Sequence, residues 1–354
     1  MNHAHSGGLQ ASRILAGAVA AGLTLTACGG DAATDGASAG DEPTAEEPYY
    51  AGTTIDFVVP YEPGGGYDTY ARALAPYLGE CLDAKLVVQN EPGAGGLLAT
   101  NRTFSTSADE ARIQIVNTVG AVSAQIAGAE GVQFDMLEFS PVGRIVATTS
   151  ALAVGADSQM QDFQDLIDMD QPVRFPSTGE GANDYITPNV LAAIYGFETE
   201  MITGFQGSGE ARLALISGDG DAYVQSWDSM YDSIQSGEVR PLVVASMEPV
   251  EKLPDVPTLA DYEPDGEGGE QLRNELSALE ATGRGIVAPP GLPDDRLAEL
   301  QEGFTCAFEN EDFLSELEKQ ERPLNVLSGV EWQEVLDEAL NSSEQFQTII
   351  TESF

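Results

Sequence analysis

Short apolar runs alternate with stretches of helical periodicity along most of the chain. The first two runs, Ile55–Val59 and Leu86–Asn90, are rich in β-branched residues, so we expect them to be buried strands. A helical stretch follows each run: Leu74 and Leu78 recur at helical spacing after the first, and residues 97–105 follow the second. Strands that alternate with helices in this way predict an α/β fold with a parallel sheet.

The alternation begins again near residue 173, which predicts a second domain. Further strands are expected at residues 112–118, 139–147, 149–154, 173–175, 222–225, 242–245 and 285–288, and further helices at 162–168, 208–217, 296–308, 312–320 and 330–352. Thr187 and Pro188 favour the cap and first residue of another helix. Ser328 has the spacing of a capping box with Glu331. The acidic, glycine-rich residues 263–283 predict an insertion or a long loop.

Each of the first two strands ends at a glycine-rich turn. Pro63-Gly64-Gly65-Gly66 follows the first strand, and Pro92-Gly93-Ala94-Gly95-Gly96 follows the second. Glycine allows close approach to the backbone, and the first N–H groups of a helix have no partner within the helix. In a parallel sheet both turns lie at the carboxyl ends of neighbouring strands, where ligands bind. The pattern favours an anion site over the alternative, glycines needed only for packing.

The amino terminus has the features of an export signal. Arg13 precedes the apolar run Ile14–Leu25, which is too short to span a bilayer, and small residues precede Cys28. This pattern resembles a bacterial lipoprotein signal, in which residues 1–27 are removed and Cys28 is acylated; an ordinary signal with an incidental cysteine is the alternative. Residues 28–51 are expected to be a flexible tether. We therefore expect an extracytoplasmic protein, attached to the cell membrane by a lipid anchor only.

If Cys28 carries lipid, Cys81 and Cys306 remain as an even pair in an oxidising compartment. The expected helix 296–308 has an apolar stripe, and Cys306 lies roughly opposite to it, where a core thiol is not expected. The stripe consists of Leu297, Leu300, Phe304 and Phe308. We favour a disulfide between Cys81 and Cys306, with two buried thiols as the alternative.

The composition and the histidines exclude several classes of function. The chain of 354 residues has 58 acidic and 15 basic residues, and its net charge of −43 excludes nucleic acid as a partner. Both histidines, His3 and His5, lie in the signal region, so the mature chain has none for a catalytic pair or a metal site. Neither glycine turn completes a phosphate-loop or dinucleotide-binding motif. We predict no enzyme, no cofactor and no metal.

Six motifs in order resemble the extracytoplasmic solute-binding proteins of tripartite tricarboxylate transporters, the Bug receptors. They are Val59-Pro60-Tyr61 with Pro63-Gly64-Gly65-Gly66 and Asp68, Asn90 with Pro92-Gly93-Ala94-Gly95-Gly96, Ser177-Thr178-Gly179, Phe205-Gln206-Gly207, Leu253-Pro254-Asp255-Val256-Pro257-Thr258, and Ala288-Pro289-Pro290-Gly291. The resemblance covers about residues 53–350. Gln206 departs from it, because a lysine is common at that position.

The resemblance implies a two-lobed fold of the periplasmic-binding-protein type, closing like a flytrap on a small carboxylate. Residues 52–148 and 247–354 would form the first lobe and residues 149–246 the second. The protein would be a monomer that delivers its ligand to the large and small membrane subunits of a transporter. A solute sensor that is not coupled to transport is the alternative.

The resemblance also implies which residues bind the ligand. The two glycine turns would hold one carboxylate through backbone N–H groups, and a loop of the second lobe would contact the rest of the ligand. The expected ligand-binding residues are Tyr61, Gly64, Gly65, Gly66, Asp68, Gly93, Ala94, Gly95, Ser177, Thr178 and Gly179. Phe205 is a candidate wall of the pocket. Asp228 is a candidate partner for an amine or hydroxyl group of the ligand, or else a solvated loop acid.

Overall fold

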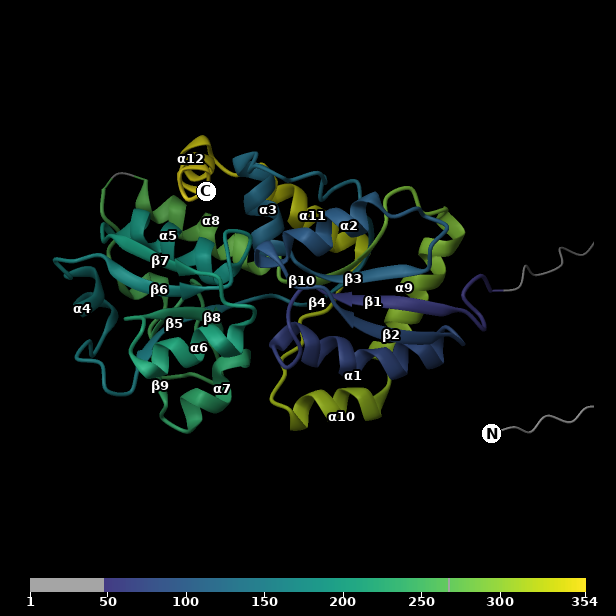
Figure 1. The fold of residues 1–354 in the computed structure, drawn as a ribbon, viewed down its shortest axis with the longest axis horizontal. Coiled ribbons are helices and arrows are strands. Elements are labelled where there is room, and N and C mark those ends of the chain that lie inside the picture. The colour runs from purple at the N-terminus through teal and green to yellow at the C-terminus, as the bar shows by residue number, and fades with distance from the viewer. Residues whose placement is uncertain (1–47, 267) are drawn as a thin grey trace, which may run out of the picture. The chain divides into compact units, whose positions relative to one another are not determined.

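A six-stranded mixed sheet, with strand order β11-β4-β10-β3-β1-β2, forms the base of what we call the first lobe (Figure 1). Its strands are β1 (Thr54–Val59), β2 (Lys85–Asn90), β3 (Arg112–Asn117), β4 (Ser140–Val146), β10 (Arg284–Ala288) and β11 (Leu327–Ser328). β1 pairs in parallel with β2 and β3, whereas β10 is antiparallel to β3 and β4. The expected adjacency of the first two strands is confirmed, so the turns after them lie at the same edge of the sheet.

The first lobe also contains the helices α1 (Gly66–Cys81), α2 (Leu97–Ser105), α3 (Thr118–Ala127), α9 (Asp294–Phe308), α10 (Glu311–Lys319) and α11 (Gly329–Leu340). α11 begins with the expected capping box, because the Ser328 side chain accepts from the Glu331 N–H and the Glu331 side chain accepts from the Ser328 N–H. The short 3₁₀ helix η1 (Ala94–Gly96) lies between β2 and α2.

Two smaller sheets build the second lobe. β5 (Ser150–Gly155) lies between β8 (Tyr223–Ser226) and β9 (Val239–Val244), and β6 (Val173–Ser177) pairs in parallel with β7 (Thr199–Thr203). The helices of this lobe are α4 (Phe163–Ile167), α5 (Asn183–Tyr195), α6 (Ser208–Ser217) and α7 (Trp227–Gln235).

The computed structural model describes residues 48–266 and 268–354. The predicted signal peptide, the lipidation of Cys28 and the tether up to residue 47 lie outside the described residues. Tyr49 and Tyr50, expected in the tether, instead donate their backbone N–H groups to Glu299, and the Tyr50 side chain is buried. The folded part therefore begins earlier than expected. Within the described ranges, no helix is long and apolar enough to cross a membrane.

Three expectations about helices are wrong. Residues 263–283 are not a long loop, because α8 (Gly269–Ala281) occupies most of them and buries Leu272, Leu276 and Leu279. The expected helix 330–352 is two helices, α11 and α12 (Glu344–Glu352), and Ser343 caps the second. α5 begins at Asn183 rather than at Pro188, and the Thr187 hydroxyl donates to Glu280 instead of capping the helix.

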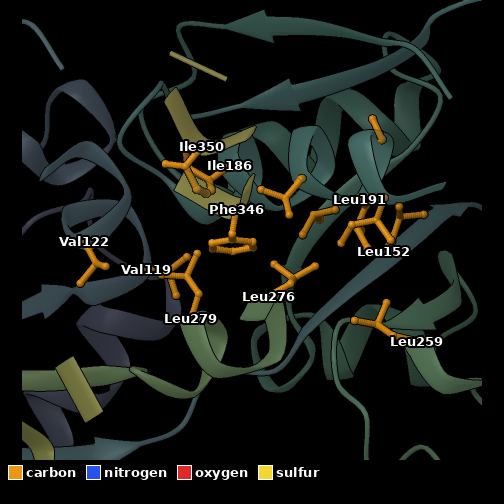
Figure 2. Close-up of a cluster of buried hydrophobic side chains, with 14 of the residues drawn as sticks. Val119, Val122, Leu152, Ile186, Leu191, Leu259, Leu276, Leu279, Phe346 and Ile350 are labelled. Atoms are coloured by element: carbon orange, nitrogen blue, oxygen red, sulfur yellow. The ribbon is translucent and has the colours of Figure 1, made fainter. Parts of the chain in front are cut away.

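Helices α8 and α12 contact α5 of the second lobe, although the sequence analysis assigned both stretches to the first. Figure 2 shows the apolar cluster that joins them: Phe346 and Ile350 of α12 lie beside Ile186 of α5 and Leu276 of α8. The cluster also includes Val119 of α3, so the core extends across both lobes. The 3₁₀ helix η2 (Leu259–Asp261) contributes Leu259 to it.

Cys81 at the end of α1 and Cys306 in α9 form a disulfide, the pair that the sequence analysis favoured. The bond closes a loop with a sequence separation of 225 residues. A long loop loses much conformational entropy in the unfolded state when it is closed, so such a bond stabilises a protein by about 2–4 kcal/mol.

Replacing both cysteines by serine is therefore expected to lower the free energy of unfolding by about 2–4 kcal/mol, measured by urea denaturation. A reducing agent should destabilise the parent chain by a similar amount and leave the double variant unchanged. Equal stability of parent and variant would contradict a stabilising role for this bond.

Candidate functional site

A cavity of about 60 Å³ lies where the β1–α1 turn meets the second lobe. A buried water needs about 10–15 Å³ measured in this way, so the cavity has room for about four waters or a small solute. It is lined by Tyr61, Glu62, Gly65, Gly66, Tyr67, Thr178, Ala182, Asn183, Asp184, Ser208, Tyr223, Val224, Gln225, Ser226, Ser229 and Arg284. We call it the central cavity.

The beginnings of four helices face the central cavity. Its lining includes Gly66 at the start of α1, Asn183 of α5, Ser208 of α6 and Ser229 in the first turn of α7. None of these helices has a side-chain hydrogen bond at its N-cap. Uncapped N–H groups and the positive ends of helix dipoles both favour a bound anion.

Glycine is required at the start of α1 because the second lobe approaches it closely. A Cβ at Gly66 would lie 2.2 Å from Ser229 Oγ and 3.2 Å from a guanidinium nitrogen of Arg284. Gly65 has more space, since a Cβ there would meet only Ser208 Oγ, at 3.2 Å. Both glycines line the central cavity, as the sequence analysis expected of the site.

Asp68 does not line the cavity but shapes the turn before it. Its carboxylate accepts from the Gly64 N–H at 2.9 Å, from Arg72 Nε at 2.9 Å and from Asn90 Nδ2 at 3.0 Å. Burial raises the pKa of Asp68, but these hydrogen bonds outweigh it and leave the pKa lowered. The carboxylate is thus occupied within the protein, and neither Asp68 nor Gly64 belongs to the cavity lining.

The second glycine turn lines a different cavity, of about 360 Å³. Gly93, Ala94, Gly95, Gly179 and Phe205 all belong to this second cavity, together with the acidic Glu130 and Glu180. The central cavity also has two acids in its lining, Glu62 and Asp184, but only the central lining includes an arginine, Arg284, so the second cavity is the poorer place for an anion. The sequence led us to expect that both turns line one site, whereas in the structure they line two different cavities.

Tyr61 separates the two cavities and borders both. Its hydroxyl donates to the Gly95 carbonyl at 2.8 Å and accepts from Asn117 Nδ2 at 2.8 Å. Asn117 also donates to the Gly181 carbonyl of the second lobe at 3.1 Å. The second turn therefore contacts the second-lobe loop instead of opening into the central cavity. A Cβ at Gly95 would lie 2.5 Å from the Gly181 carbonyl carbon.

Arg284, the first residue of β10, is a functional candidate that the sequence analysis missed. Its guanidinium lies 4.9 Å from the centroid of the Tyr67 ring, and the side chain is 3% exposed. Nη1 donates to Asp228 at 3.0 Å, and Nη2 donates to Ser226 Oγ at 2.5 Å. Burial lowers the pKa of Arg284, but the Asp228 carboxylate together with Tyr67 and Tyr70 outweighs it and leaves the pKa raised. A permanent positive charge thus lies in the wall of the central cavity.

Asp228 is not part of the cavity lining, and the alternative interpretation of it as a solvated loop acid is wrong. It is 7% exposed, so it is not a solvated loop acid. Its Oδ2 accepts from Arg284 and from Arg322, each at 3.0 Å, and Ser226 donates to its Oδ1. Burial raises the pKa of Asp228, but the two arginines lower it further than burial raises it. Asp228 belongs to α7 of the second lobe and both arginines to the first, so this carboxylate joins the lobes.

Asp184 is the second candidate that the sequence analysis missed. It lines the central cavity at the start of α5 and is 6% exposed. Its Oδ1 accepts from Ser177 Oγ at 2.9 Å and from Thr178 Oγ1 at 3.1 Å. Burial raises the pKa of Asp184 to about 6, although these hydrogen bonds act in the opposite direction. Thr178 lines the cavity as expected, whereas Ser177 lies behind Asp184 and is not part of the lining.

Comparison with known proteins settles the family. Residues 70–352 match the model of the tripartite tricarboxylate transporter family receptor. The chain belongs to this family. Since this is a family of transporter receptors, the protein is a binding protein rather than an enzyme.

Relatives of this receptor family span most of the chain. A UPF0065 protein of Pseudomonas sp. strain P51 is 28% identical over 304 residues, covering 84% of this chain and 85% of its own length. Protein BugT of Bordetella pertussis is 26% identical over 217 residues, covering 60% of this chain and 66% of its own.

Solved structures of receptors share the fold. Periplasmic binding protein BugD superposes with a TM-score of 0.72 at 20% identity, covering 86% of this chain and 98% of its own. MatC of Rhodopseudomonas palustris, solved with bound malate, has a TM-score of 0.70 at 20% identity, covering 84% and 99%. An R. palustris protein solved with adipate has a TM-score of 0.70 at 20% identity, covering 88% and 98%. The expected two-lobed binding-protein fold is confirmed.

Proposed function

We propose that the protein is an extracytoplasmic solute-binding protein that captures a small carboxylate in the central cavity and delivers it to a tripartite tricarboxylate transporter. The observation that carries the proposal is the meeting of four uncapped helix starts with the buried guanidinium of Arg284. Membership of the receptor family supports the delivery step. Related structures with malate and adipate support the chemical class.

Local donors decide whether this acidic protein can hold an anion. The net charge of −43 repels a carboxylate at long range, but physiological salt screens that repulsion over about 8 Å. A hydrogen bond to a charged group contributes about 1.5–3 kcal/mol. Four or five such contacts, less the cost of association, reach the roughly 8 kcal/mol of micromolar binding.

Binding and closure are coupled in this proposal. The ligand would bind the closed arrangement of the lobes more tightly than an open one and so shift the population toward it. We propose that two parts of the chain move relative to each other: residues 52–148 with 247–354, and residues 149–246. Helices α8 and α12 fall within the first part by sequence but contact α5 of the second. The chain would act as a monomer held to the cell membrane through lipid on Cys28, with the large and small membrane subunits as its partners.

A thermal-shift screen followed by calorimetry tests the capture step. Di- and tricarboxylates, amino acids and aromatic acids are each added to the protein, with the corresponding neutral amides as matched controls. At least one carboxylate is expected to raise the midpoint of unfolding and to bind with a micromolar dissociation constant, while its amide does not. If no carboxylate shifts the midpoint, or if the amides act equally, capture of an acid in this cavity is wrong.

A solute sensor remains the second proposed function, because binding lobes alone do not distinguish it from a transport receptor. Deletion of the protein in its host separates the two. Loss of uptake of the identified carboxylate would support delivery to a transporter. Unchanged uptake together with a lost transcriptional response to the solute would support the sensor.

A further inference from the structure

The lining of the central cavity includes groups of opposite charge, Asp184 and Arg284. β8 runs along it from Tyr223 to Ser226, which are three residues apart and so separated by about 10 Å. Tyr223 OH donates to Asp184, and Ser226 Oγ accepts from Arg284. The buried carboxylate thus contacts the first residue of β8 and the buried guanidinium contacts the last.

Building on the proposed function, we infer that the ligand is a small carboxylate that also carries a hydrogen-bond donor, an ammonium or a hydroxyl group, and that Asp184 accepts from this donor. The carboxylate of the ligand would face Arg284, and its donor would face Asp184. Asp184 is then a specificity-determining residue of the binding site.

The long contacts of Asp184 Oδ2 support this assignment. Oδ1 already accepts from Ser177, from the Thr178 N–H and from the Thr178 hydroxyl. Oδ2 has only longer contacts, to the Thr178 N–H at 3.2 Å and to Tyr223 OH at 3.4 Å. The Tyr223 hydroxyl is also 3.4 Å from the Ser208 carbonyl, so it is shared. These four donors match the roughly four hydrogen bonds that an ionised carboxylate accepts, so a ligand donor at Oδ2 would replace the long contact from Tyr223 with a shorter one.

The surroundings of Asp184 disfavour a second acid group at this end of the cavity. Across residues 48–266 and 268–354, none of the ion pairs involves Asp184, so its charge is not neutralised by a cation. Another carboxylate beside it would place two like charges in a buried site, which is costly. An ammonium group would pair with the charge, and a hydroxyl group would donate to it.

Protonation of Asp184 should weaken the preference of the site for a ligand that carries an ammonium group. Burial raises the pKa of Asp184 to about 6, so its charge is lost below that pH. The groups facing it are Ser177 at the end of β6, Thr178 directly after it, Tyr223 from β8 and Tyr61 from the β1–α1 turn. Burial raises the pKa of both tyrosines well above 10, so they stay neutral. Glu62 and Arg284 are the other charged residues in the cavity lining.

Ligands that differ only in their distal group test the inference. Calorimetry on the full chain at pH 8 compares 4-aminobutyrate, 4-hydroxybutyrate, butyrate and succinate, and then the three-carbon set of β-alanine, 3-hydroxypropionate, propionate and malonate. In the chain length that fits, we expect the ammonium ligand to bind about ten-fold or more tighter than the methyl and dicarboxylate ligands, with the hydroxyl ligand between them. The preference for the ammonium ligand should become smaller at pH 5. For this comparison, each affinity is expressed per fully ionised ligand.

The Asp184→Asn variant should lose the preference for the ammonium ligand and its dependence on pH, while exposed Asp219→Asn should keep both. The pH comparison uses the unmodified chain and so stands even if the variant fails to fold. If succinate or malonate binds as tightly as the matching amino acid at pH 8, or if Asp184→Asn keeps the preference, the inference is overturned and the proposed function stands. If no carboxylate of any class binds the full chain, both fall.

Discussion

Replacing Asp228 by alanine is expected to destabilise the protein by about 3–5 kcal/mol, because the buried Arg284 and the partly buried Arg322 then lose their counter-charge. Arg284 and Arg322 both donate to Asp228 Oδ2 at 3.0 Å, and the side chain of Arg322 is only 15% exposed. The variant leaves positive charge in a region closed to water. Urea denaturation at pH 7 measures the change in the free energy of unfolding.

A matched control replaces Asp109, which pairs with Arg296 but has an 85% exposed side chain. Asp109→Ala should cost no more than about 1 kcal/mol, because water screens an exposed pair. The effect of Asp228→Ala should also depend on pH. The pKa of Asp228 is lowered in the folded state, so its stabilisation is present above the unfolded pKa of about 3.9 and is lost as the pH falls through the folded pKa. Equal costs for the two variants at pH 7 would contradict the role of Asp228 between the lobes.

The second large effect is expected at Gly95, where an alanine should weaken ligand binding by about a hundred-fold without unfolding the protein. A Cβ at this position would lie 2.5 Å from the Gly181 carbonyl carbon and 2.6 Å from the Ala182 nitrogen. These are backbone atoms of the second lobe and cannot rotate away, so the closed arrangement becomes less populated. Apparent affinity falls in proportion to the population of the binding-competent state.

Gly64 provides the control for backbone strain at Gly95. Both glycines have positive φ, +93° at Gly64 and +63° at Gly95, but a Cβ at Gly64 would meet nothing within 4 Å. Gly64→Ala should therefore cost about 1 kcal/mol in stability and leave affinity nearly unchanged. Calorimetry with the carboxylate found in the screen measures both variants. Normal affinity in Gly95→Ala, or an equal loss in Gly64→Ala, would exclude closure at this contact.

The sequence predicted the features that depend on neighbouring residues. Apolar runs located β1 and β2, and the glycines after them located the beginning of α1 at the cavity. The capping box at Ser328 was found because its two partners are three residues apart. Local patterns of this kind are sufficient to position a strand, a turn and a helix start.

Residues brought together by distant parts of the chain were missed. Arg284 meets Asp228 from 56 residues away, and Arg322 meets the same carboxylate from 94 residues away. Arg284 also directly follows a stretch that was expected to be a loop. The acidic composition concealed α8, although Leu272, Leu276 and Leu279 have helical spacing.

The expected single site is divided between two cavities for a similar reason, because the contact involved joins residues far apart in the sequence. Tyr61 lies in the first glycine turn, and its hydroxyl reaches the Gly95 carbonyl 34 residues away, which separates the second turn from the central cavity. A motif identifies which turns can bind an anion, but contacts between distant residues, such as that of Tyr61 with Gly95, affect which of them faces the cavity. Placing the start of α5 at Asn183 would have revealed Asp184, because an acid in the first helical turn is then expected near the cavity.

The most direct test of the central claim is a crystal structure of the protein with the carboxylate identified by calorimetry. We predict that its carboxylate oxygens lie in the central cavity, within hydrogen-bond distance of N–H groups at the start of α1 or of a second-lobe helix, and toward Arg284. A ligand that occupies only the cavity beside Gly93–Gly95, or that directs its carboxylate away from every helix start, would contradict the claim.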